Sequence, residues 1–417
     1  MSLEDYVEEL EPDTDRERRK LAEEKSYRIL DHLDGFEDRF NEVKQGDSLF
    51  GSTSPSVFVG RSSYPRVPVG LLNPVGEEEN PAEYTTSGDW YHDGMNIEGV
   101  LQYRTGLLNS RRRTDVDLSD STNLLDVQKE VGMATDPVDV EVRLRDEPDL
   151  DLDMDQVTAP TGPNATARDA DLAENPYVPR EIEKTFEDTD WKSRGAVEYL
   201  YEKGFDVYQI NDVLSVGALG RGEDRKLVPT RWSITAVDDM LGKYLRGEVK
   251  GNTSVDKTRV YMNEYMGNRY WVVFTPGRWE FELVEMKSPG SVWNPNPDDE
   301  IWMGSAREGY EGRTGYVDET AGAYYCSRLG VLEQLRSIGR SGKCLVLREV
   351  SDDYWAPVGV WQVREAVRNA GENSYVEYET FGDAVRDVVD YLPVSLPDLR
   401  RKSTMVSGLQ TSLSRFG

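Results

Sequence analysis

Arg231 and Trp232 are neighbouring side chains whose chemistry suits a nucleic-acid strand. They directly precede a stretch predicted to be helical, and the N-terminus of a helix favours anions such as phosphate. A guanidinium can bind a phosphate while an indole stacks on a base. Arg61 and the run of three arginines that begins at Arg111 can extend this pair into a basic groove. We therefore treat Arg61, Arg111, Arg231 and Trp232 as candidate DNA or ligand contacts. The alternative is that Arg231 forms a structural ion pair and Trp232 belongs to the core.

Glu285 and Lys287 suggest a different chemistry. An E-x-K pair on a strand is half of a metal-dependent nuclease centre, in which carboxylates hold Mg²⁺ and the lysine stabilises the attacked phosphate. Such a centre needs another acid on a neighbouring strand, for which Glu264 is the candidate. Two classes of function stay open: a binding factor without chemistry of its own, and an enzyme that acts on DNA or on a nucleotide-derived lesion. An enzyme should bring Arg231 and Trp232 into one pocket with Glu285 and Lys287, whereas a binding factor should spread its arginines over an open groove.

Histidine and cysteine are too scarce for most other sites. Cys326 and Cys344 are the only cysteines, and His32 and His92 are the only histidines. Four-ligand zinc coordination and a Ser-His or Cys-His catalytic pair therefore find no support. We expect no metal and no cofactor, and we assign no catalytic residue.

The sequence ends in "QTSLSRFG", which places Gln410, Leu413 and Phe416 three apart. In one turn of 3₁₀ helix, residues three apart eclipse, so the leucine and phenylalanine would project together as an apolar plug. The alternative is a frayed end without a role. The motif consists of Gln410, Thr411, Ser412, Leu413, Ser414, Arg415, Phe416 and Gly417.

This ending resembles the peptide (PIP motif) with which proteins dock on the sliding clamp PCNA. The resemblance implies PCNA as a partner. Many such motifs carry two adjacent aromatic residues, whereas Gly417 stands at the second place here. This departure should weaken the binding.

The composition is strongly acidic, with a net charge of −29 and only 49 basic residues against 78 acidic ones. A surface rich in Asp and Glu suits a salt-rich cytoplasm, in which self-repulsion is screened. We interpret the charge as adaptation to high salt in a halophilic archaeon; an ordinary acidic protein is the alternative. The charge argues against a DNA coat held by bulk electrostatics, but a local arginine patch is still compatible with DNA binding.

No apolar run reaches membrane-spanning length, and the N-terminus lacks the apolar stretch of a signal peptide. We therefore expect a cytoplasmic protein with no membrane partner. The length of 417 residues favours more than one domain. We divide the chain into a block at residues 1–145, an acidic Pro-rich insertion or linker at 146–179, a block at 180–393 and a flexible tail at 394–417.

The pattern of apolar residues predicts an α+β fold, with a mixed or antiparallel sheet, packed helices and a flexible C-terminal tail. Residues 270–287 are predicted to form a hairpin around Pro276 and Gly277. Residues 98–116 are predicted to be a helix that ends in the three arginines, and residues 205–220 to be strand. The acidic stretch 146–179 is expected to be mobile or to lie over the surface.

Four strings carry a resemblance to a known family: "DSLFGSTSPSVFVGRSSYPRVPVGLL", "LVPTRWSITAVDD", "GAYYCSRLGVLEQL" and "GVWQVRE". They resemble the archaeal Nre family, from about residue 46 to the C-terminus. The resemblance implies a DNA-repair protein that is recruited to the replication clamp through its C-terminal motif. Some members carry an N-terminal cysteine cluster suggestive of zinc, which this sequence lacks. No zinc site is therefore transferred from the family.

Overall fold

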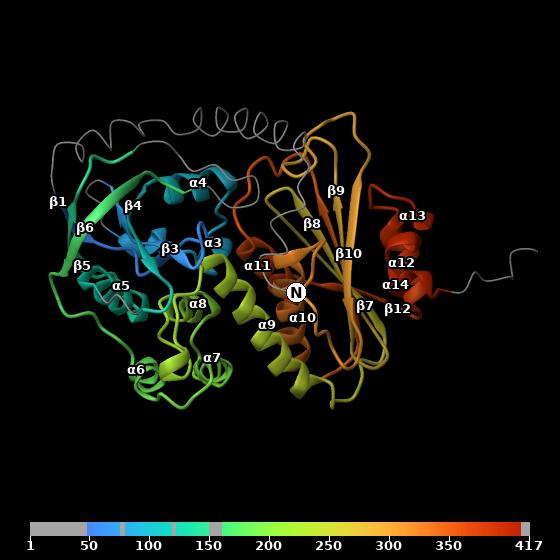
Figure 1. Cartoon of the computed structure of the whole chain (residues 1–417). Coiled ribbons are helices and arrows are strands. Elements are labelled where there is room, and N and C mark those ends of the chain that lie inside the picture. Colours follow the sequence, from blue (N-terminus) through green and yellow to red (C-terminus); the bar gives the residue numbers. More distant parts are fainter. Residues whose placement is uncertain (1–47, 76–79, 119–121, 150–160, 410–417) are drawn as a thin grey trace, which may run out of the picture.

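Two mixed β-sheets with helices between them form the body of the protein. The computed structural model describes residues 48–75, 80–118, 122–149 and 161–409. Within these ranges the chain forms two six-stranded sheets and twelve α-helices, which confirms the predicted α+β class with a mixed sheet. The sheets lie at opposite ends of the molecule, and α9, α10 and α11 lie between them (Figure 1).

The first sheet has the strand order β1-β5-β6-β4-β3-β2. β4 and β6 are parallel, and the other neighbours are antiparallel. Val57, Leu71 and Leu108 lie on one face and join the main core with Val131 of α5. Its strands are β1 (Ser48–Ser52), β2 (Val57–Val59), β3 (Arg66–Pro74), β4 (Leu107–Asp115), β5 (Asp139–Leu144) and β6 (Asn164–Leu172).

The second sheet has the order β10-β9-β11-β8-β7-β12, with β9 and β11 parallel. Its central strands are apolar on both faces. Val272 and Phe274 point into the main core, whereas Val273 and Leu345 join a second core on the outer face. Its strands are β7 (Thr258–Tyr265), β8 (Asn268–Thr275), β9 (Glu280–Lys287), β10 (Trp302–Glu308), β11 (Lys343–Val350) and β12 (Tyr375–Tyr378).

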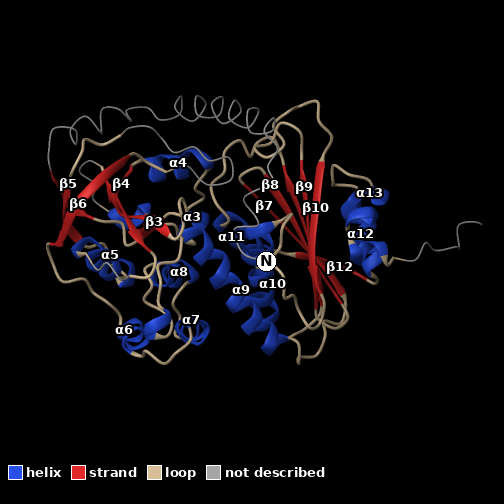
Figure 2. Ribbon diagram, viewed as in Figure 1, coloured by secondary structure: helices blue, strands red, loops and turns tan. Residues whose placement is uncertain are grey.

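Helices pack against both sheets, as Figure 2 shows. α5 packs on the first sheet, α10 and α11 pack on the inner face of the second, and α12 packs on its outer face. None of the helices described is long and apolar enough to cross a membrane. The helices are α3 (Asp89–His92), α4 (Ile97–Thr105), α5 (Asn123–Met133), α6 (Arg180–Glu187), α7 (Ser193–Glu202), α8 (Val207–Ser215), α9 (Thr230–Val249), α10 (Ala321–Ser337), α11 (Trp361–Ala370), α12 (Phe381–Val389), α13 (Leu396–Lys402) and α14 (Thr404–Ser407).

The predicted hairpin at residues 270–287 was wrong. Both strands exist, but β11 lies between β8 and β9 and pairs with each of them. The tight hairpin lies earlier, between β7 and β8, where Met266 and Gly267 both have positive φ, at 48° and 67°. Two consecutive residues of positive φ are typical of the type I′ turn that matches the twist of paired strands.

Two other predicted elements also differ. The helix predicted over residues 98–116 ends at Thr105, and the three arginines lie in β4. The stretch predicted as strand over residues 205–220 contains helix α8, capped by Asp206, whose carboxylate accepts a hydrogen bond from the backbone N–H of Gln209. Val207, Ile210 and Leu214 are buried along it, with the spacing of a helix face.

Part of the predicted acidic linker belongs to the sheet. β6 lies between β4 and β5, and Ala165, Ala167 and Ala170 are buried in the main core. The expectation that this segment lies over the surface was therefore wrong for residues 164–172. Small alanine side chains fill the interior of the sheet there, which the Asp and Pro content of the segment concealed.

The chain after residue 393 is folded up to Leu409. α13 and α14 pack on the outer core through Leu399 and Val406. The buried carboxylate of Glu282 on β9 accepts hydrogen bonds from the Ser403 hydroxyl and the backbone N–H groups at the start of α14. The predicted flexible tail was therefore wrong for residues 394–409, and residues 410–417 lie outside the described chain.

Candidate nucleic-acid interface and adjoining cavity

The first turn of α9 carries Arg231 and Trp232, so the helix begins earlier than predicted. The Thr230 hydroxyl accepts a hydrogen bond from the backbone N–H of Val59 at 3.0 Å. This bond fixes the start of α9 against β2, shortly before the loop that carries Arg61.

A surface cluster forms where this loop meets α9. The rings of Tyr64 and Trp232 lie 5.2 Å apart and are tilted by 54°. Burial raises the pKa of Tyr316, and the nearby charges of Arg231 and Arg61 oppose this increase. Tyr64 and Tyr316 are 48% and 54% exposed, so both rings are available for stacking. We define the aromatic–arginine patch as Arg61, Tyr64, Arg113, Arg231, Trp232 and Tyr316.

β4 connects the run of arginines to this patch. Arg113 donates a hydrogen bond to the Ser63 hydroxyl at 2.9 Å, in the loop of Arg61. Because side chains alternate along a strand, Arg111 and Arg113 share one face with Asn109, whereas Arg112 points to the other face. Arg111 is half-buried and lies opposite Gly70 in β3. The structure thus brings Arg61, Arg231 and Trp232 together, whereas Arg111 lies two residues before Arg113 on the same face of β4.

A cavity of about 170 Å³ lies beside β2, β4 and the start of α9. β2 contributes Phe58 to its wall, β4 contributes Asn109, and α9 contributes Thr230 and Ile234. β4 and α9 therefore contribute to both the patch and the cavity. We call this hollow the central cavity; its wall includes Phe58, Arg104, Asn109, Asn211, Asp212 and Trp361.

Two ionisable groups in the central cavity have shifted pKa values. Burial raises the pKa of Asp212 well above its ordinary value of 3.8, although hydrogen bonds from Val57 and Ser56 oppose the shift. Burial lowers the pKa of Arg104 to about 10. Arg104 donates a hydrogen bond to the Thr86 hydroxyl at 3.0 Å, and its guanidinium carbon lies 5.7 Å from the centre of the Trp90 ring.

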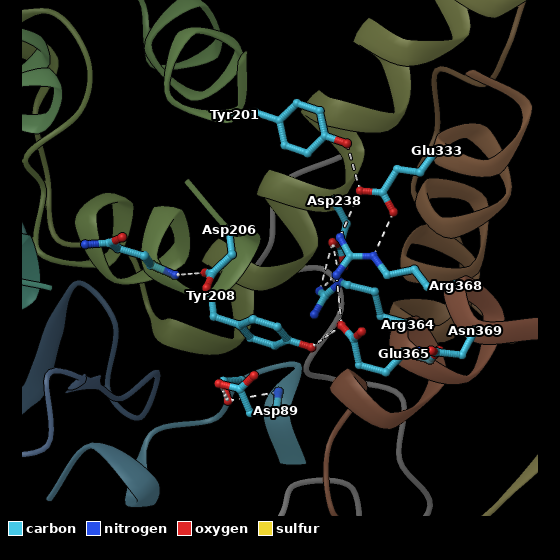
Figure 3. Close-up of polar contacts among 12 residues, drawn as sticks. Asp89, Tyr201, Asp206, Tyr208, Asp238, Glu333, Arg364, Glu365, Arg368 and Asn369 are labelled. Carbon is cyan, nitrogen blue, oxygen red and sulfur yellow. Dashed lines mark hydrogen bonds and ion pairs between the residues drawn. The ribbon is translucent and has the colours of Figure 1, made fainter. Parts of the chain in front are cut away.

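A network of buried ion pairs borders the cavity between α9, α10 and α11 (Figure 3). Arg364 lines the cavity, and its guanidinium donates to both carboxylate oxygens of Asp238, at 2.8 and 2.7 Å. Arg368 forms ion pairs with two carboxylates, those of Glu333 and Glu365. These arginines are fully partnered within the protein, which indicates that they hold the helices together.

The three residues of the nuclease hypothesis do not form a common site. Glu285 is buried and forms an ion pair with Arg348 at 2.5 Å. Glu264 lies on β7, which is separated from β9 by β8 and β11, so the hypothesis that it completes a centre with Glu285 was wrong. The ammonium of Lys287 lies 3.8 Å from the centre of the Trp302 ring. Within the ranges described, no group of three His, Cys, Asp or Glu side chains is placed to hold a metal ion.

Sequence reasoning missed the polar residues of the central cavity. Arg104, Asn109 and Asp212 come from three separate elements, and only the fold brings them together. The string at residues 47–72, used for the family resemblance, was the one available signal, because it contains Phe58 and the loop of Arg61. The other predicted site, Gln410 to Gly417, lies outside the residues that the structure describes.

The chain belongs to the archaeal Nre family. The profile described as "Archaeal Nre, N-terminal" matches residues 21–294, and "Archaeal Nre, C-terminal" matches residues 308–416. Together they include the patch, the cavity and most of the C-terminal motif.

Its relatives are named as DNA repair proteins. The chain is 60% identical to the DNA repair protein NreA of Haloferax volcanii, over the full length of both chains. It is 37% identical to the DNA repair protein NreA of Archaeoglobus fulgidus, over 82% of this chain and 85% of the relative. It is 36% identical to the DNA repair protein NreB of the same organism, over 90% of this chain and 93% of the relative. No solved structure matches the chain significantly.

Proposed function

We propose that this protein is a DNA repair factor that docks on the sliding clamp PCNA through residues 410–417 and contacts DNA with the aromatic–arginine patch. It acts in the cytoplasm of a salt-adapted archaeon. The observation that carries the proposal is the Q-x-x-L-x-x-F spacing of Gln410, Leu413 and Phe416. The names of its full-length relatives support the repair role.

The anchored helices before the motif support clamp docking. Leu409, the last described residue, packs against the outer core beside α14. The motif therefore begins directly at a folded surface. Burial of Leu413 and Phe416 in a partner would contribute about 1.5–3 kcal/mol each, enough for micromolar affinity after the cost of ordering the segment.

Titration of purified clamp with the full-length protein tests the docking. We expect Phe416→Ala to weaken binding by about 2–3 kcal/mol, or roughly 30- to 150-fold, because an apolar anchor in a small interface acts as a hot spot. Ser412→Ala is the matched control and should bind as the wild type does. If deletion of residues 410–417 leaves the affinity unchanged, the docking proposal is wrong.

A second titration, with double-stranded and single-stranded DNA and no clamp, tests the patch. Arg113→Ala should weaken DNA binding, whereas Arg112→Ala, on the opposite face of the same strand, should not. Trp232→Ala should weaken binding to single strands by about 1–3 kcal/mol through lost stacking. Equal losses in the two arginine variants would show that the patch has no specific role.

A further inference from the structure

The central cavity contains buried asparagine amides with polar atoms that have no hydrogen-bond partner among the described residues. Asn109 is 1% exposed, and neither its Oδ1 nor its Nδ2 has a hydrogen-bond partner within the described chain. Asn211 is 4% exposed, and its Oδ1 is also without a partner there. Buried polar groups are nearly always hydrogen-bonded, because an unmade bond costs free energy. Two such amides in the wall of one cavity therefore point to a ligand with donors and acceptors.

Arg104 points to an anionic group on the same ligand. The buried arginines Arg328, Arg348 and Arg364 each form an ion pair with a carboxylate. Arg104 forms none with the part of the chain that is described, and its Nε is buried without a partner. The Arg104 side chain also lines the cavity. Arg104 is half-buried and its Nε is enclosed, so a guanidinium there without a counter-charge is costly, and a phosphate or carboxylate would satisfy it.

The volume and walls of the cavity suit an aromatic ring. Its volume of about 170 Å³ is close to the roughly 150 Å³ that accommodates a benzene molecule in an engineered protein cavity. The aromatic rings of Phe58, Tyr208 and Trp361 line it. Residue 70, which lies beside Asn109 on the neighbouring strand, has room only for glycine, because a Cβ atom on residue 70 would lie 2.3 Å from the Asn109 Oδ1. The amide is therefore accommodated by the backbone of the neighbouring strand.

We propose that the central cavity binds a nucleotide, with its base against Asn109 and Asp212 and its phosphate against Arg104. An asparagine amide can donate to and accept from one base edge, which makes it a reader of bases. Aromatic walls with hydrogen bonds to the base edge are also the arrangement used for bases taken out of a duplex.

The ligand can be a free mononucleotide or a nucleotide extruded from DNA. Arg111 and Arg113 follow Asn109 at alternate positions of β4, so a strand bound on the patch would pass the cavity. The proposal does not depend on clamp docking, since it uses no residue of the C-terminal motif.

Calorimetric titration of the full-length protein with the four deoxynucleoside monophosphates, the corresponding nucleosides and inorganic phosphate tests the proposal. We expect a monophosphate to bind and Asn109→Ala to weaken it roughly 10- to 100-fold. Arg104→Gln should weaken the monophosphate by a similar factor but leave the nucleoside nearly unchanged. Arg112→Ala should bind as the wild type does.

Thermal unfolding of the free variants separates a binding role from a structural one. Asn109→Ala removes two unpartnered groups and no hydrogen bond, so its unfolding temperature should not fall. A large fall would show that Asn109 supports the fold and would overturn its assignment to a ligand. The proposal would also be overturned if the wild type did not bind a monophosphate, or if Asn109→Ala and Arg104→Gln left that binding unchanged. Inorganic phosphate that bound as tightly as the monophosphate would overturn it too.

The source of the nucleotide is decided by competition. A duplex that carries 2-aminopurine at a mismatch should gain fluorescence when the protein takes the base out of the stack. If this gain is lost in Asn109→Ala and suppressed by the monophosphate, the ligand comes from DNA. If the monophosphate binds but the duplex does not compete, the ligand is the free nucleotide.

Discussion

Replacement of Glu282 by glutamine should release the C-terminal helices from the second sheet. The side chain is 1% exposed, and its carboxylate accepts hydrogen bonds from the Ser403 hydroxyl at 2.8 Å and from the backbone N–H groups of Thr404 and Met405 at 2.7 and 2.8 Å. All three partners are donors. An amide in place of the carboxylate therefore directs an NH₂ group at one or two of them.

The magnitude follows from these bonds. A hydrogen bond to a charged group contributes about 1.5–3 kcal/mol to stability, and removing one partner so that a buried donor is left unsatisfied costs about 1–3 kcal/mol. Glu282→Gln keeps the shape of the side chain and one acceptor oxygen. We therefore expect a loss of roughly 2–4 kcal/mol in the free energy that holds α13 and α14 on β9 and β10, because one to two bonds are lost.

Hydrogen exchange of the Thr404 and Met405 amides is the measurement. In the wild type these amides should exchange slowly, and Glu282→Gln should accelerate them by roughly 30- to 900-fold, which corresponds to the loss above. Glu372→Gln, an exposed glutamate, is the control. Exchange that is as slow in Glu282→Gln as in the control would refute the view that this carboxylate anchors the helices.

Three further predictions concern the interior. Burial raises the pKa of Asp212 in the folded state, so above pH 3.8 the folded protein binds more protons than the unfolded chain. Stability should therefore fall as the pH rises toward the folded pKa. Asp212→Asn should flatten this dependence in denaturant titrations and be the more stable form at neutral pH. Asp238→Ala leaves Arg364 buried without its ion pair and should cost about 3–5 kcal/mol in chemical denaturation, and a loss below 1 kcal/mol would contradict the role of the pair. Gly267→Ala places a Cβ atom 2.6 Å from the backbone nitrogen of Tyr354 at a φ of 67°, so it should lower the unfolding temperature, which calorimetry would show.

Local patterns in the sequence predicted the existence of strands and helices better than their pairing. β8 and β9 were both predicted, but their pairing was wrong because β11, which is almost sixty residues later, lies between them. A turn at Pro276 and Gly277 is compatible with a hairpin and with a wider connection, and only the later strand decides between them. In α8, by contrast, the spacing of Val207, Ile210 and Leu214 was visible and outweighs its content of β-branched residues.

The candidate site shows the same division between local and long-range information. Arg61 and Trp232 were recognisable from their chemistry, but their neighbours Tyr64 and Tyr316 were not, because the contact joins segments far apart in the chain. Asn109 carries no local signal at all. An asparagine in a strand is unremarkable until the fold shows it buried and without a partner.

The two proposed binding surfaces lie on different parts of the molecule, which bears on how they would act together. α13 and α14 cover the outer face of the second sheet, whereas the patch lies at the start of α9 beside the first sheet (Figure 1). Eight residues can span at most roughly 29 Å, so a clamp bound to residues 410–417 would stay close to the folded body. Because a sliding clamp travels on DNA, this short connection raises the local concentration of DNA near the protein. A protein with a net charge of −29 gains little from long-range attraction to DNA, particularly when salt screens it. Salt does not weaken the apolar contact with the clamp, so that contact can hold the protein near DNA where bulk charge does not. The aromatic rings of the patch can then stack on the bases.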